Sequence, residues 1–196
     1  MYVATESGTE RSLCIELVLE DIPGGGIVDP DDFKSTTTVM PEGTLLGKDS
    51  NGIYHIFKTA ELYENETNTE TAYKVLKNHE FKVGDFLMAA IDTGSACYAI
   101  TAIDTSNANY DVLTVGTTLG LAMNDGDLLA QGTSQQASAG AGVYKYDPVG
   151  IALNSVDLSL DNQGCGVMVR GTVNQSLLPY AVDTKIKAYI PLVRFN

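Results

Sequence analysis

The residues that could carry catalytic chemistry are few in this chain, and they stand far apart. There are two histidines, His55 and His79, and three cysteines, Cys14, Cys97 and Cys165. Nucleophilic catalysis requires a nucleophile beside a base, and acid–base catalysis requires groups that face each other. No cysteine has a histidine near it in the sequence, and all three occur in apolar, strand-like contexts. The sequence therefore predicts structural roles for these residues, and it predicts that the protein is not an enzyme.

Oxygen ligands for a cation occur in two stretches, 104–111 (Asp-x-x-Asn-x-Asn-x-Asp) and 29–32 (Asp-x-Asp-Asp). The first lacks the alternating acids, the central glycine and the distal glutamate of a calcium-binding EF-hand loop. Asp and Asn are also common turn residues, and this interpretation is favoured for both stretches. The stretch 43–48 is one residue shorter than a phosphate-binding loop and lacks its final Ser or Thr. We therefore expect no metal and no cofactor.

The composition and charge of the chain limit the classes of partner that it can bind. The chain has 196 residues, of which 44% are hydrophobic and 19% charged, with a net charge of −13. Proteins that bind nucleic acid or anionic membranes present clusters of Lys and Arg, and no such cluster is present. The first residues do not have the pattern of a secretory signal, so we expect none, and no apolar run reaches the roughly 20 residues needed to cross a bilayer. We expect a soluble protein made in a cytoplasm, with reduced thiols and with neither nucleic acid nor membrane as a partner.

Short apolar runs separated by Gly, Asn and Asp predict a mainly β fold. Residues 39–57 read as two strands joined by a turn at Ser50-Asn51-Gly52, and residues 146–179 as a second strand pair. Residues 81–131 contain about five short strands, which suits a small barrel. The polar stretch 61–77 is predicted to be a loop.

The two ends of the chain differ in character. The first 38 residues are acidic and interrupted by Pro23-Gly24-Gly25-Gly26, which predicts an arm with one strand at 12–19. Near the C-terminus, helical spacing at 181–189 predicts a short helix capped by Asp183 or Thr184. Pro191 ends that helix, and a final strand follows at 192–195.

Two stretches, 39–57 and 144–196, resemble the head decoration proteins of tailed bacteriophages, of the type found in phage lambda. The first has the pattern P-x-GTxLGKDSNGxY, and the second contains V-x-V-x-G-x-V at 167–173. The run KVGD…AITAIDTSNANYDVLTV…TLG between them is similar to insertions in decoration or head-fibre proteins of phages from gut bacteria. The resemblance implies a discontinuous decoration-like β core at 39–79 and 140–196 with a short C-terminal helix. It also implies an inserted barrel-like β domain with a flexible linker at 80–139, preceded by the arm at 1–38.

The resemblance further implies a capsid-binding structural protein of the virion, located on the outer surface of the head. Its partners would be the major capsid protein and two further copies of itself, arranged as a trimer at the local three-fold positions of the lattice. The arm would add a strand to the capsid through Leu13, Ile15 and Leu17. Leu177, Leu178 and Tyr180 are the candidate residues of the trimer interface. The inserted domain would project outward and could anchor a head fibre.

A different class of function fits the ten tyrosines and five phenylalanines. A carbohydrate-binding or adhesive module of a phage tail or fibre would present some of these aromatic rings to solvent, in the middle unit above all. Decoration subunits would be present in hundreds of copies on each head, and fibre modules in far fewer. Particle location therefore separates the two interpretations.

Overall fold

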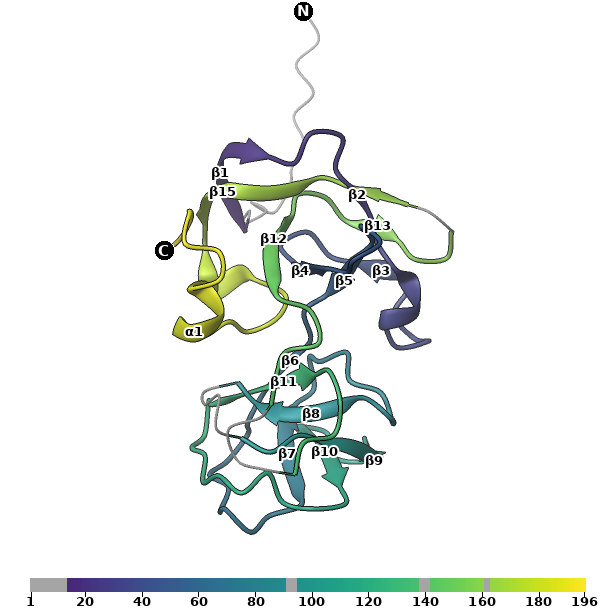
Figure 1. Ribbon diagram of the computed structural model, residues 1–196, viewed down its shortest axis with the longest axis vertical. Helices are drawn as coiled ribbons and strands as arrows, with labels where there is room; N and C mark the ends of the chain where they lie inside the picture. The colour runs from purple at the N-terminus through teal and green to yellow at the C-terminus, as the bar shows by residue number, and fades with distance from the viewer. Residues whose placement is uncertain (1–13, 91–94, 138–141, 161–162) are drawn as a thin grey trace, which may run out of the picture.

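The computed structural model describes residues 14–90, 95–137, 142–160 and 163–196. It is mainly β, with antiparallel sheets and one short α-helix. Two units lie end to end along the long axis of the molecule, and two chain segments connect them (Figure 1). We call the unit that contains both ends of the described chain the main unit, and the other the second unit.

The main unit is built around one six-stranded sheet. Its strands follow the order β1-β15-β12-β4-β5, and β16 pairs with β15 in parallel. The bounds of these strands are β1 Ile15–Asp21, β4 Leu45–Lys48, β5 Tyr54–Ile56, β12 Pro148–Ala152, β15 Val167–Val173 and β16 Val193–Phe195.

Shorter elements cover this sheet. Two small ribbons pair β3 with β13 and β2 with β14. The bounds of these ribbons and of the helical turns are β2 Gly26–Ile27, η1 Pro30–Asp32, β3 Val39–Met40, β13 Val156–Asp157, β14 Gly164–Cys165, η2 Gln175–Leu177 and α1 Thr184–Lys187.

The second unit contains a single six-stranded sheet in the order β6-β11-β8-β9-β10-β7. Among the described residues, the end strands β6 and β7 are linked by an isolated bridge between Leu62 and Val75. The sheet is not closed, so the predicted barrel is wrong in this respect. The bounds of the strands are β6 Thr59–Glu61, β7 Ala72–Leu76, β8 Phe86–Ala89, β9 Tyr98–Asp104, β10 Tyr110–Val115 and β11 Leu128–Gly132.

Several local predictions agree with this fold. β4 and β5 form a hairpin whose turn places Gly52 at φ +91°, a backbone conformation that glycine adopts without a steric penalty. β12 and β15 pair antiparallel, with Ile151 opposite Met168. The Asp183 side chain accepts a hydrogen bond from Ile186 N and so caps α1.

Other predictions differ from the structure at points of long-range pairing. Part of the expected loop at 61–77 forms β7, which pairs with β10. The second unit therefore begins at Thr59, not at residue 80. Residues 15–38 do not form a separate arm, because β1 pairs with β15 and Val28 and Phe33 are buried in the main unit.

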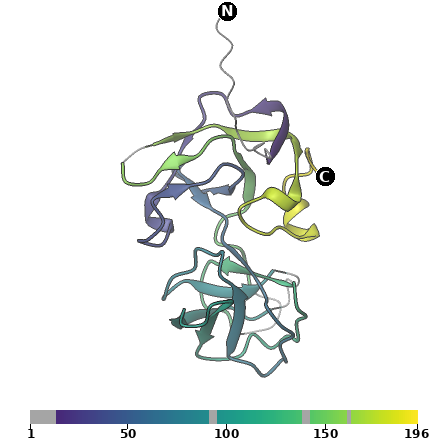
Figure 2. The same cartoon turned by 180° about the vertical axis from the view of Figure 1, so that it is seen from behind.

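The junction between the units is packed. One apolar cluster includes Leu128 and Ala130 of β11 together with Val182, Ile186 and Ile190 from the segment around α1. The hydroxyl of Tyr144 also donates a hydrogen bond to the Ala90 carbonyl at 3.0 Å. The view from behind shows the two connecting segments passing side by side through this junction (Figure 2). Shared burial of this kind holds both units in one arrangement.

Candidate functional sites

The first candidate site is the outer edge of β1. This strand pairs with β15 on one side, and in the part of the chain that the structure describes it has no strand on its other side. Leu17, Val18 and Leu19 are exposed by 49%, 43% and 60%. An edge strand with free backbone groups and apolar side chains is a template for a strand from another chain.

The exposure of three consecutive residues has a geometric cause. A regular strand would direct alternate side chains inward. The pairing of β1 with β15 shifts register between Ile15 and Leu17 and again between Val18 and Glu20. These bulges bend the strand and remove the alternation that the sequence predicts. We call Leu17, Val18 and Leu19 the edge patch.

The predicted capsid-binding residues have three different positions. Leu13 lies outside the described residues. Ile15 is partly buried and packs against the core of the main unit, whereas Leu17 belongs to the edge patch. Only Leu17 among them is thus shown to be available to a partner.

The predicted trimer-interface residues do not share one exposed surface. Leu177 is 37% exposed, but Leu178 is partly buried against the core of the main unit. Tyr180 is only 7% exposed, and its hydroxyl donates a hydrogen bond to Glu80 Oε1 at 3.3 Å. Burial, together with the nearby Glu80 carboxylate, raises the pKa of Tyr180.

The second candidate site brings together side chains that lie apart in the sequence. His55 in β5 is buried, and its Nδ1 lies 2.7 Å from Asp32 Oδ2 and 3.7 Å from Asp29 Oδ2. Its Nε2 lies 3.8 Å from Asp49 Oδ2. We call these four residues the aspartate–histidine cluster. The clue in the sequence was a histidine within a buried strand, but nothing in the sequence placed Asp29 and Asp32 beside it.

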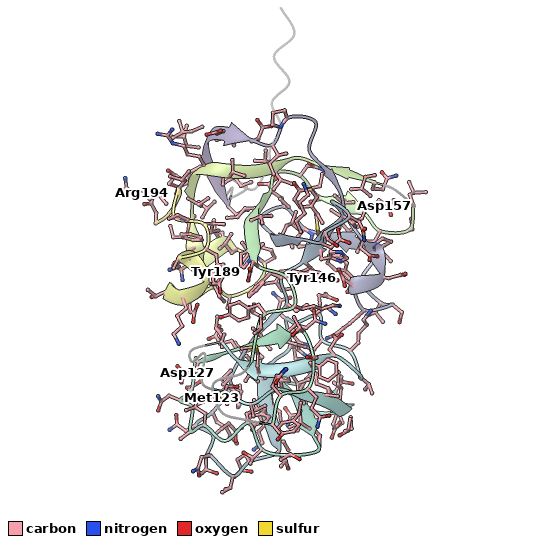
Figure 3. The ribbon with its side chains drawn as sticks, viewed as in Figure 1. Met123, Asp127, Tyr146, Asp157, Tyr189 and Arg194 are labelled. Atoms are coloured by element: carbon pink, nitrogen blue, oxygen red, sulfur yellow. The ribbon has the colours of Figure 1, made fainter. Side chains whose placement is uncertain are left out.

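Tyr146 covers the imidazole of this cluster. The two rings stack with centroids 3.9 Å apart and planes inclined by 8°. Gly47 lies opposite His55 in the β4–β5 hairpin. Its lack of a side chain makes room for Tyr146, because a Cβ at Gly47 would lie 2.5 Å from the Tyr146 Cβ. Burial, and then the carboxylates of Asp32, Asp29 and Asp49, raise the pKa of Tyr146 to about 12. Figure 3 shows Tyr146 beside the junction of the two units.

The other histidine belongs to a separate ionic group. His79 Nε2 lies 3.2 Å from Asp111 Oδ2, and Lys77 Nζ lies 2.7 Å from Asp111 Oδ1. Burial, and then the positive charge of Lys34, lower the pKa of His79 to about 4. Glu80 accepts hydrogen bonds from Lys34 N and from the Thr37 hydroxyl, which ties this group to the main unit. The arrangement joins the two units.

The cysteines have the properties of structural thiols. All three are buried and unpaired by disulfide. Burial, followed by the adjacent Glu42, raises the pKa of Cys14 to about 11, and burial raises that of Cys97 to about 11. The Cys165 thiol donates a hydrogen bond to the Gly166 carbonyl oxygen at 3.1 Å. A reactive cysteine needs a lowered pKa and access to solvent, and these thiols have neither.

In the stretch 104–111, Asp104 and Asn107 use side-chain oxygens for turns, whereas Asp111 pairs with Lys77 and His79. Asp104 Oδ1 accepts a hydrogen bond from Ser106 N, and Asn107 Oδ1 accepts one from Asn109 N, both at 2.9 Å. These are the local contacts that Asp and Asn side chains make in turns. Asp104 and Asn107 therefore make the contacts that the turn interpretation predicts.

Two cavities lie along the junction. One of about 630 Å³ is bordered by Thr59, Asn78, Gln175 and Asp183, among others. The other, of about 850 Å³, has Lys34, Thr37, Lys82 and Leu158 among its lining residues. Within the described ranges, no helix is long and apolar enough to span a membrane.

Comparisons with models of protein families, with curated proteins and with solved structures find no match to this chain.

Proposed function

We propose that this chain is a structural protein of a phage virion, which decorates the outer surface of the head by binding the major capsid protein. The observation that carries the proposal is the edge patch on β1. A protein that reinforces a shell needs a surface for its partner and needs no catalytic group. The edge patch is such a surface, and the buried thiols and paired histidines described above have structural roles.

The chemistry of β1 specifies what the partner strand should look like. A strand added beside β1 would form backbone hydrogen bonds along the free edge and bury the edge patch. Glu16, Glu20 and Asp21 lie on the same strand. Basic side chains beside the partner's docking strand would complement these carboxylates and orient it. The proposed occupant is therefore an extended segment of the capsid protein with apolar residues and Lys or Arg close by.

We propose further that three copies act together as a homotrimer. A trimer presents the same edge three times, so that weak individual contacts combine through a high effective concentration. Leu177 is the predicted interface residue that remains exposed, at 37%. The second unit would then extend away from the capsid, where a head fibre could attach.

The test is cosedimentation of the purified protein with heads that lack it. Deletion of residues 1–24 is unsuitable, because it would remove β1 from its own sheet. The double variant Leu17→Glu/Leu19→Glu changes exposed side chains and keeps the strand. We expect it to lose at least about tenfold in affinity for heads, because two carboxylates would be buried unpaired at the contact.

The matched control is Val83→Glu, which changes a 62% exposed apolar residue in the second unit. It should sediment with heads as the wild type does. Light scattering after size exclusion should give the mass of three chains for all forms. Unchanged binding by the double variant, with its thermal unfolding also unchanged, would exclude the edge patch as the capsid contact.

One observation favours a second candidate, a carbohydrate-binding module. Tyr63 is 38% exposed and lies against Tyr110, with ring centroids 5.1 Å apart. Aromatic rings at a surface can stack on the apolar face of a sugar. Glycan-array binding that is lost in Tyr63→Ala, by a protein that does not sediment with heads, would favour this function over decoration.

A further inference from the structure

Three potential metal ligands converge where the N-terminal segment meets the β4–β5 hairpin. Asp29 is the N-cap of η1, Asp32 lies within η1, and His55 lies in β5. Their ligand atoms all lie within 4.8 Å of one another. Ligands bound at 2.0–2.2 Å to one zinc ion are about 3–4 Å apart, so small side-chain movements would bring these atoms onto a single cation.

The backbone brings the three residues together before any cation binds. A bridge joins Val28 to Tyr54, and Asp29 N donates a hydrogen bond to the Tyr54 carbonyl at 2.9 Å. Asp29 Oδ1 accepts from Asp31 N, which leaves Oδ2 directed toward His55. The positions of the ligands are therefore set by main-chain pairing.

The second imidazole nitrogen, Nε2, lies outside this ligand set. The His55 side chain is 7% exposed, and its Nε2 is buried with no hydrogen-bond partner among the residues that the structure describes. A buried polar atom without a partner is costly. Nε2 faces Asp49 Oδ2 at 3.8 Å, just beyond hydrogen-bond distance. A histidine bound to metal through one nitrogen usually donates its other N–H to a carboxylate, and Asp49 has this position.

The charge balance also favours a cation. Three carboxylates surround one imidazole, and Asp32 has a second cationic neighbour, Lys145, whose Nζ lies 3.8 Å from its Oδ1. With a neutral imidazole, Lys145 offsets only one of the three negative charges. A divalent cation would compensate the charge of Asp32 in particular, which is buried, whereas Asp29 and Asp49 are 33% and 21% exposed.

We propose that Asp29, Asp32 and His55 Nδ1 bind one divalent first-row transition cation, with Asp49 accepting a hydrogen bond from His55 Nε2–H. Imidazole together with carboxylates suits Zn²⁺ or Mn²⁺ better than Ca²⁺, which prefers oxygen ligands throughout. Water reaches the cation on the side of Asp29, whose side chain is 33% exposed. Cation binding requires the neutral imidazole tautomer whose proton is on Nε2, so a proton on Nδ1 is exchanged through solvent for one on Nε2. The cation fastens η1 to β5, a role separate from the capsid contact of β1.

The experiment uses the full chain without an affinity tag, treated with chelator and then titrated with Zn²⁺ or Mn²⁺ alone. Calorimetry should give one ion per chain, and saturation should raise the thermal unfolding midpoint. Asp29→Asn and Asp32→Asn should each weaken binding at least about tenfold. Asp49→Asn should weaken binding by about 10- to 100-fold, as loss of an outer carboxylate typically does.

Asp157→Asn is the matched control, since Asp157 is an exposed aspartate at the end of β13 in the same unit. Its affinity and its metal-dependent stabilisation should equal those of the wild type. Two results would overturn the proposal: absence of binding by the wild type at millimolar ion, or binding that Asp29→Asn and Asp32→Asn leave unchanged. Each variant is also measured without metal, so that a general loss of folding is recognised.

Discussion

The ammonium group of Lys58 lies 2.8 Å from the carboxylate of Asp85. Lys58 stands between β5 and β6, where the chain passes from the main unit to the second unit, and its side chain is 1% exposed. Burial lowers the pKa of Lys58, and the hydrogen bond that Lys58 donates to Asp85 opposes that shift. Asp85 also accepts hydrogen bonds from Gln131 and from the backbone of Lys82. One carboxylate thus holds the crossing segment to β11 and to the turn before β8.

Replacing Lys58 by Met should destabilise the protein markedly. The substitution leaves Asp85 largely buried without its positive partner, which costs about 3 kcal/mol of unfolding free energy. Urea unfolding measures this loss. Lys74→Met is the control, because the Lys74–Glu64 pair is exposed to solvent and should contribute little to the unfolding free energy. Equal losses of unfolding free energy in both variants would show that burial does not make the Lys58–Asp85 pair more important than an exposed pair.

Stability should fall as the pH decreases through the region in which His79 titrates in the unfolded chain. The pKa of His79 is lowered from 6.5 to about 4 in the folded protein. Between these values the unfolded state binds a proton that the folded state does not, so acid favours unfolding. The contribution of neutral His79 to the unfolding free energy is fully present above the unfolded pKa. About 2 kcal/mol of this free energy should be lost between pH 7 and pH 5.

The comparison of wild type with His79→Gln isolates this effect. The wild-type unfolding free energy should decrease more steeply between pH 7 and pH 5 than that of the variant. The charged neighbours Lys34, Lys77 and Asp111 are present in both proteins. Parallel pH profiles would show that His79 is not held neutral in the folded state.

Gly171→Ala should weaken the pairing of β1 with β15. Gly171 lies opposite Val18 in the register, and a Cβ at this position would lie 2.2 Å from the Leu17 carbonyl oxygen. That oxygen belongs to the backbone, so the strand itself must move, at a cost of about 1–3 kcal/mol. Gly116→Ala is the control, because a Cβ added there would have no atom within 4 Å. Thermal unfolding should show a lower midpoint for Gly171→Ala only.

The thiols should react slowly while the protein is folded. A pKa of about 11 for Cys14 and Cys97, against 9.0 without burial, lowers their thiolate fraction on the order of 100-fold near pH 8. Reaction with a chromogenic disulfide should therefore be slow in buffer and rapid for all three cysteines in denaturant. A thiol that reacts in buffer at its unfolded rate would identify an accessible site.

The sequence determined the parts of this protein that depend on local chemistry. The turn at 49–53 is closed by Asp49, whose carboxylate accepts hydrogen bonds from Asn51 N and Ile53 N, and Gly52 supplies the positive φ. The cap of α1 by Asp183 and the β9–β10 hairpin follow from neighbouring residues in the same way. Such contacts span a few residues, so their residue types alone predict them.

The tertiary structure alone decided the pairings between distant segments and the sites that these create. The sequence predicts that β1 is part of an arm. In the structure β1 pairs with β15, which lies far along the chain, and bulges in that pairing expose the edge patch. Part of the stretch predicted to be a loop becomes β7 because β10 pairs with it. His55 and Asp32 meet only because the Val28–Tyr54 bridge brings η1 to the hairpin. Such contacts depend on closing long loops and on shared burial, which propensity and spacing along the chain do not encode.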